Sequence, residues 1–112
     1  MEIKAKEKNI QSAILQYLEL RGIFAWRNNS GMVHQQYGDK FYRMRLGPAG
    51  SPDIIGMLPD GRFLGIEVKV PGGKMSEIQI AFMKTIKEKK GVAFMATSVD
   101  EVEKFLKVYS NT

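Results

Sequence analysis

A strand–turn–strand segment covering residues 53 to 69 constrains the fold of this chain more than any other feature. From Phe63 to Lys69 the side chains alternate with the period of two of a β-strand, and the apolar residues share one face. Pro59-Asp60-Gly61 precedes this strand and has the composition of a tight turn, in which glycine can adopt a positive φ. Residues 53 to 58 then form the partner strand. We therefore predict an antiparallel hairpin within a sheet.

The turn brings two carboxylates face to face. If Pro59-Asp60-Gly61 is a three-residue loop, Asp53 lies directly opposite Glu67, with Cβ atoms roughly 4.5–5.5 Å apart. Facing like charges destabilise a sheet, and a divalent cation between them would remove the repulsion. Hard cations such as Mg²⁺ prefer carboxylate oxygens. The pattern predicts a metal site at Asp53 and Glu67. A four-residue loop would break the direct opposition but not the proximity.

Two further charged residues have both a catalytic and a structural interpretation. Lys69 shares the face of Glu67, where an ammonium can stabilise a developing phosphorane charge or orient the attacking water. An isolated Glu-x-Lys pair is more simply a surface salt bridge on an edge strand. Glu7 lies on the core-facing side of a predicted helix, close to Ile14 by the helical period, where a carboxylate needs a partner, so it is a candidate to complete the acidic set as a further metal ligand. It is alternatively a favourable acid in the first helical turn.

The remaining periodicity predicts a mixed sheet flanked by helices. Helices are expected over about 4–21, over 76–90 and from 98 onward, the last two beginning at Ser-x-x-Glu/Gln capping boxes that include Gln79. Strands are expected over 23–27, 40–46 and 92–97, while 32–39 shows no clear period. The order is α-β-(β)-β-β-α-β-α, an α/β fold. We expect Trp26 in the core rather than as a base-stacking platform, and the apolar face of the second long helix at Ile78, Phe82 and Ile86.

Composition narrows the class of protein. A chain of 112 residues suits one domain over residues 1–112, and a formal charge of +5 favours polyanionic partners such as nucleic acid. The absence of cysteine excludes disulfides and thiolate chemistry. No apolar run is long enough for a membrane span, and the charged start of the chain is unlike a signal peptide. We expect a cytoplasmic protein without membrane partners, in a bacterial or virus-infected host cell.

An ordered set of motifs resembles the virus-type replication-repair nuclease (VRR-Nuc) domain of the PD-(D/E)xK nucleases. The set spans almost the entire chain and consists of Trp26-Arg27-Asn28-Asn29-Ser30-Gly31, Gly50-x-Pro52-Asp53-Ile54, Gly61-Arg62, Ile66-Glu67-Val68-Lys69, Gly73-Lys74-x-Ser76 and Gln79-x-x-Phe82. The resemblance implies a restriction-endonuclease-like fold and metal ligation by Asp53, Glu67 and the Val68 carbonyl. It also makes Glu7 the helix-borne acid of the family and Gln79 its helix-borne glutamine near the active site, although Gln79 equally fits a capping role.

The resemblance implies an endonuclease that hydrolyses DNA phosphodiesters with Mg²⁺ or Mn²⁺. Small stand-alone members resemble homodimeric enzymes that act on branched DNA, in the manner of Holliday junction resolvases. The segment 32–44 is our expected dimer interface, and no further DNA-binding domain is expected. A non-catalytic nucleic-acid-binding module and a nuclease acting on RNA or DNA ends remain alternatives. The candidates for nucleic-acid contacts are Arg27, Asn28, Lys40, Arg43, Arg45 and Lys74.

Overall fold

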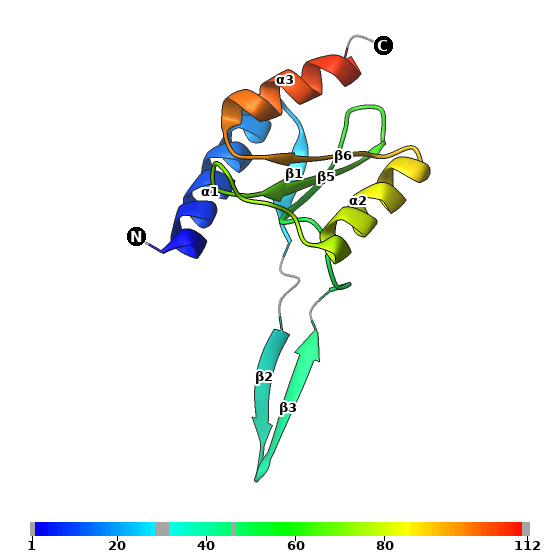
Figure 1. Ribbon diagram of the computed structural model, residues 1–112. Helices are drawn as coiled ribbons and strands as arrows, with labels where there is room; N and C mark the ends of the chain where they lie inside the picture. The colour runs from blue at the N-terminus through cyan, green and yellow to red at the C-terminus, as the bar shows by residue number, and fades with distance from the viewer. Residues whose placement is uncertain (1, 29–31, 46, 111–112) are drawn as a thin grey trace.

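The computed structural model describes residues 2–28, 32–45 and 47–110, without the side chains of 32–35, 42–45 and 110. A four-stranded sheet is flanked by three helices, and a separate two-stranded hairpin extends from this body (Figure 1). The mixed α/β fold predicted from the sequence is confirmed. Within the described ranges, no helix carries an apolar stretch long enough to cross a bilayer. The elements are α1 (Ile3–Leu20), β1 (Phe24–Arg27), β2 (Met32–Tyr37), β3 (Lys40–Arg45), β4 (Ile54–Met57), β5 (Phe63–Val68), α2 (Glu77–Glu88), β6 (Val92–Ala96) and α3 (Val99–Ser110).

The main sheet has the strand order β1-β4-β5-β6. The strands β1, β4 and β5 are antiparallel neighbours, whereas β6 lies parallel to β5. The β4–β5 register pairs Ile54 with Ile66, and the Leu58 amide donates to the Arg62 carbonyl at 2.9 Å. Gly61 has a φ of 92°. The predicted three-residue loop and its register are therefore confirmed.

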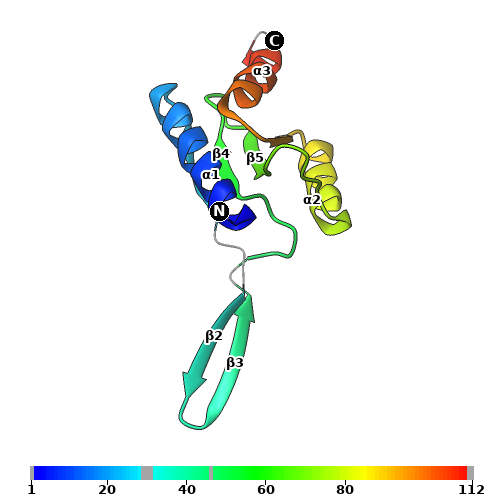
Figure 2. The ribbon, with the colours of Figure 1, turned by 60° about the vertical axis from the view of Figure 1, so that its left-hand side comes forward.

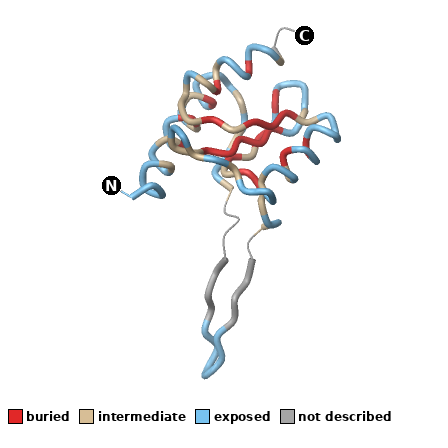
Figure 3. Tube along the Cα trace, viewed as in Figure 1, coloured by how far each residue is buried: buried red, intermediate tan, exposed pale blue. Residues whose placement is uncertain are grey.

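The two faces of the sheet are covered unequally. One face packs against α1 and α3 in a continuous core that includes Ile14, Leu18, Ile66 and Val102, visible as buried stretches in Figure 3. On the other face, α2 contributes Met83 and Ile86, which pack with Ala93 of β6. The prediction for Ile78 was wrong, because its side chain is 57% exposed. Its Cγ2 methyl and its carbonyl group lie against Gly50, in the loop before β4.

The β2–β3 hairpin includes a strand, β2, in the segment whose sequence shows no clear period. The predicted strand from Lys40 is confirmed as β3, although Leu46 lies outside the described residues, and β2 pairs with it antiparallel from Met32 to Tyr37. The element order therefore has one more strand than predicted. The turn at 38–39 uses Gly38 with a φ of 62°. In two views the hairpin stands away from the sheet and the helices (Figures 1 and 2).

The edge strand β1 exposes aromatic side chains. Trp26 is 45% exposed, so its predicted place in the core was wrong. It packs edge to face against Phe24, with ring centroids 5.5 Å apart. Both residues lie on the side of the sheet opposite Ala25, which faces the α1–α3 core. Periodicity placed the strand correctly but could not show that the Trp26 face of this strand lacks a covering helix.

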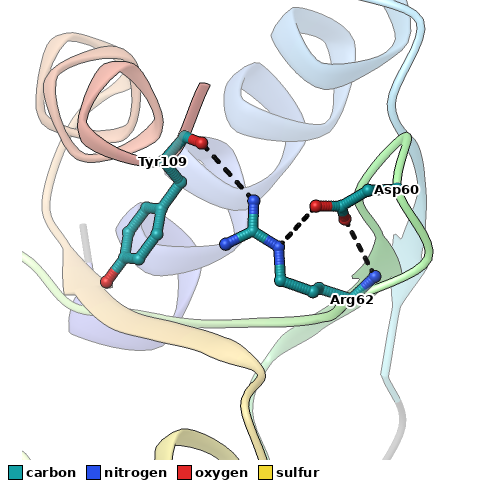
Figure 4. Close-up of polar contacts among 3 residues, drawn as sticks. All are labelled: Asp60, Arg62 and Tyr109. Carbon is teal, nitrogen blue, oxygen red and sulfur yellow. Dashed lines mark hydrogen bonds and ion pairs between the residues drawn. The ribbon is translucent and has the colours of Figure 1, made fainter. Parts of the chain in front are cut away.

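Arg62 forms hydrogen bonds both within the β4–β5 turn and to the helix α3. The Arg62 guanidinium donates to the Asp60 carboxylate at 2.7 Å and to the Tyr109 carbonyl at 3.4 Å (Figure 4). It also lies 5.7 Å from the centre of the Tyr109 ring. Hydrogen bonds from the Arg62 amide and side chain hold the pKa of Asp60 below its ordinary value. The Gly61-Arg62 motif thus supports the turn that sets the register of the two carboxylates.

Candidate active site

Asp53 is fixed at the start of β4 by both neighbouring strands. Its carboxylate oxygen Oδ2 accepts a hydrogen bond from the Val68 amide of β5 at 2.8 Å. Its carbonyl accepts another from the Asn28 amide, which follows β1, at 2.7 Å. The confirmed β4–β5 register, continued by one position, places Asp53 opposite Glu67. The carboxylate is therefore held rigidly next to the second acid.

The loop before Asp53 is shaped by close packing. The Asn28 side-chain amide donates to the Ser51 hydroxyl and the Pro52 carbonyl, each at 2.9 Å. Gly50 has a φ of 79°, and a Cβ there would lie 2.6 Å from the Ile78 carbonyl oxygen. The positive φ and the close approach of Ile78 explain why a glycine stands at position 50. The two hydrogen bonds of Asn28 give this residue, predicted as a nucleic-acid contact, a structural task that occupies both of its amide hydrogens.

Glu67 is a buried acid with an incomplete set of partners. The residue is 2% exposed, and its oxygen Oε1 accepts a hydrogen bond from Gln79 Nε2 at 3.3 Å. Its other oxygen, Oε2, is buried without a hydrogen-bond partner in the described part of the chain. Burial, assisted by Asp53 and Glu7, raises the pKa of Glu67 from 4.5 to about 9, and the charge of Lys69 opposes this shift. Burial beside a second carboxylate therefore favours the protonated form of Glu67 when no cation is present.

Gln79 caps α2 and also contacts the buried acid Glu67. Its backbone amide donates to the Ser76 hydroxyl, and its side-chain oxygen accepts from the Ser76 amide at 2.9 Å, which completes the predicted capping box of α2. The nitrogen of the same side-chain amide donates to Glu67. One side chain thus fixes the first turn of α2 and the orientation of the buried acid.

Lys69 and Glu7 approach the carboxylates from different elements. Lys69 directly follows β5, and its amide donates to the Ala96 carbonyl at 3.1 Å. Among the described residues, Lys69 and Glu67 make no ion pair, so the simple surface salt bridge is absent. Glu7 lies on α1 and is half-buried. Both side chains act on Glu67 through charge.

The donor set suits a hard divalent cation. The unpartnered Glu67 Oε2 and the adjacent Asp53 carboxylate supply anionic oxygens, which such ions prefer. In the part of the chain that the structure describes, no third His, Cys, Asp or Glu completes a metal-binding group. An ion held here would therefore need the Val68 carbonyl, water or substrate oxygens to fill its coordination sphere. Mg²⁺ commonly keeps several waters in this way.

The predicted nucleic-acid contacts are spread over several elements. The Arg27 guanidinium donates to the Lys8 carbonyl and the Ser12 hydroxyl of α1. Lys40 is exposed beside the turn of the hairpin, and Lys74 is exposed in the loop before α2. The side chains of Arg43 and Arg45 lie outside the described residues. Arg27 thus also has a structural role, while the two lysines are accessible.

Asp53, Glu67 and Lys69 lie within or directly beside the neighbouring strands β4 and β5 of the mixed sheet. The family model of the VRR-NUC domain matches residues 5–100, and the chain belongs to this family. A solved structure described as a VRR_NUC domain is similar over 93% of this chain and 97% of its own, with 21% identity and a TM-score of 0.65. None of the curated proteins matches the chain. The family and restriction-endonuclease-like fold predicted from the motifs are confirmed.

The raised pKa of Glu67 predicts that the metal-free protein loses stability as pH rises. Between pH 4.5 and about 9, the folded chain still holds a proton on Glu67 that the unfolded chain has already released. The contribution of Glu67 to the free energy of unfolding is therefore fully present below pH 4.5 and is lost as the pH rises toward 9. Urea unfolding in EDTA at several pH values should show the decline, and Glu67→Gln should remove this component because glutamine stays neutral. If the free energy of unfolding fell equally with pH in the natural protein and in Glu67→Gln, the decline would not come from Glu67.

Proposed function

We propose that this protein is a Mg²⁺- or Mn²⁺-dependent DNA endonuclease that acts on branched DNA as a homodimer. The observation that carries the proposal is the buried Glu67 carboxyl, which has one unpartnered oxygen and lies opposite Asp53. Burying two adjacent carboxylates is costly unless a cation or a proton joins them. Membership of a nuclease family supports the interpretation that a cation does so during function.

Each residue of the site has a task in phosphodiester hydrolysis. Asp53, Glu67 and the Val68 carbonyl would hold the ion, with Glu7 adding negative charge from α1. When bound, Mg²⁺ activates water and neutralises charge on the scissile phosphate. Lys69 stabilises the charge that develops on the phosphorus oxygens. Gln79 orients Glu67 through its side-chain amide.

Dimerisation would match the protein to a branched substrate. One domain supplies a single pair of opposed carboxylates, whereas resolving a four-way junction requires two cuts on symmetry-related strands. A two-fold dimer supplies two equivalent sites. It also doubles the formal charge from +5 to +10, which strengthens binding that releases counterions from DNA. Exposed Lys40 and Lys74 are candidates for contacts to phosphates.

A cleavage assay with three labelled substrates tests this function. Linear, flap and four-way DNA are incubated with the protein and Mg²⁺, with EDTA as the control. We expect EDTA-sensitive cleavage and a preference for the four-way substrate, with light scattering showing a dimer. Binding without cleavage would indicate a non-catalytic module. A monomer that cuts linear and four-way DNA equally would refute the dimeric, branch-specific part of the proposal.

A further inference from the structure

The strand β1 has a free edge. It stands at the end of the sheet order β1-β4-β5-β6, so in the described part of the chain no strand pairs with its outer side. The Asn28 amide donates to the Asp53 carbonyl on the β4 side, and successive residues of an antiparallel strand direct their backbone groups alternately to the two sides. The amide and carbonyl groups of Ala25 and Arg27 therefore point away from β4. Backbone groups exposed in this way are a template for another strand.

The free edge lies in a groove beside α1. The groove has a volume of about 810 Å³ and is lined by residues 22–27 together with one side of α1. Ser12 accepts a hydrogen bond from the Arg27 guanidinium at one end of the groove. Glu19, whose carbonyl accepts from the Gly22 amide, lines the other end. Among the described residues Glu19 makes no ion pair, so the groove has a basic end and an acidic end.

We propose that two copies of this chain associate through β1, with the two strands paired antiparallel about a two-fold axis at Trp26. In this register Ala25 of one copy exchanges backbone hydrogen bonds with Arg27 of the other, and the reverse. The two four-stranded sheets then form one continuous sheet, in which the same surface is used twice. The proposal rests on the homodimer of the proposed function. It places the interface on β1, not on the segment 32–44 expected from the sequence.

Charge complementarity favours a second copy as the occupant of the groove. The antiparallel register sets Phe24 of one copy opposite Asn28 of the other, so each acidic end at Glu19 meets a basic end at Arg27. The two Trp26 side chains lie directly opposite each other, with Cβ atoms about 4.5–5.5 Å apart. The indole is 45% exposed in one chain, and contact with its symmetry mate covers part of this area. Aromatic pairs across strands stabilise a sheet.

The continuous sheet places both candidate active sites on one face. Asp53 pairs with Asn28, two residues after Trp26, so Asp53 and the Glu67 opposite it lie on the Trp26 face. Rotation about an axis perpendicular to the sheet leaves this face common to both copies. With about 4.8 Å between strands and about 3.3 Å between residues, the two Asp53 residues are about 20 Å apart. The dimer therefore presents two equivalent sites, side by side, to one substrate.

Cysteine cross-linking tests the register directly, because the natural chain contains no cysteine. In Trp26→Cys the two thiols face each other across the axis, within reach of a disulfide, so mild oxidation should give covalent dimers on non-reducing gels. The matched control is Met57→Cys, which is 47% exposed on the same face but lies on β4, away from the edge. It should run as a monomer. Equal yields, or no Trp26→Cys disulfide in a protein that light scattering shows to be dimeric, would overturn the proposal.

Removing one outward amide provides an independent measurement. Ala25→Pro deletes an N–H that the sheet of one copy does not use, and proline is tolerated at such positions of edge strands. Two intermolecular hydrogen bonds are lost per dimer, which should raise the dimer dissociation constant roughly 30-fold. Ala25→Ser keeps the amide and should leave the constant unchanged. Circular dichroism checks that both variants fold. A folded Ala25→Pro that dimerises as tightly as the natural protein would refute the strand pairing.

Cleavage distinguishes failure of this interface from failure of the proposed function. Monomeric Ala25→Pro should retain Mg²⁺-dependent nicking of linear DNA but lose the paired cuts of a four-way substrate. If Trp26→Cys cross-links as expected and the natural protein cleaves none of the substrates, the interface stands and the nuclease activity is refuted. If the natural protein cleaves as a dimer and Trp26→Cys gives no disulfide, the activity stands and the pairing through β1 is refuted.

Discussion

Replacing Asp53 with Asn or Glu67 with Gln should reduce DNA cleavage to background while the chain still folds. Each change removes one anionic oxygen donor from the proposed metal site but preserves the shape of the side chain. In Glu67→Gln a neutral amide takes the place of the buried carboxyl group, whose Oε2 has no hydrogen-bond partner among the described residues. The metal-free melting temperature of this variant should therefore rise at pH 8, because a neutral amide replaces an acid that resists ionisation.

The matched control is Asp60→Asn, which makes the same chemical change in the turn of the same hairpin. Asp60 is exposed and contacts Arg62 rather than the two acids. Plasmid nicking with Mg²⁺ should continue in this variant and stop in the other two. Full activity in Asp53→Asn or Glu67→Gln would remove both residues from the catalytic site, whatever their effect on stability.

Replacing Lys69 with Ala should lower the single-turnover rate by at least roughly 10²-fold, the scale of losing one electrostatic contact made in the transition state. The affinity for DNA should change little, because one phosphate contact is a small part of a total that depends on salt. Separate measurements of DNA binding and of cleavage at saturating protein distinguish the two effects.

Lys84→Ala provides the control for Lys69, since it removes the same charge from the exposed surface of α2. It should change neither the rate nor the affinity by more than the loss of one surface charge. If Lys69→Ala instead weakened binding strongly and left the rate unchanged, Lys69 would be a residue that binds DNA rather than one that stabilises the transition state. The loss of activity would then be recovered at higher protein concentration.

The local rules of strands and turns were sufficient to predict how the central residues of the candidate site are arranged. The period of two placed Glu67 and Lys69 on one face, and the turn at Pro59-Asp60-Gly61 set the register that brings Asp53 opposite Glu67. The capping box at Ser76 located the start of α2. These features depend on neighbours close in sequence, so the sequence carries them directly.

Features that depend on distant packing were harder to predict. Nothing in the sequence around Trp26 shows that no helix covers its face of β1. The helical period likewise does not show that Ile78 packs against Gly50. The loop-holding role of Asn28 spans more than 20 residues of sequence, as its bonds to Ser51 and Pro52 show. A signal was available there, because an asparagine directly after a strand often binds nearby backbone groups. The strand β2 lacks alternation because both of its faces carry polar residues.

The Gln79 side chain makes two hydrogen bonds, one to Ser76 at the start of α2 and one to the buried acid Glu67. Helix termini fray, and a capping interaction typically contributes about 1 kcal/mol against that opening. Whenever the first turn of α2 opens, the Gln79 amide leaves Ser76 and Glu67 together. Brief local unfolding of a single turn would therefore release the buried acid from its orienting partner, so the fraction of time that this site is competent follows the helix–coil equilibrium at residues 76–79.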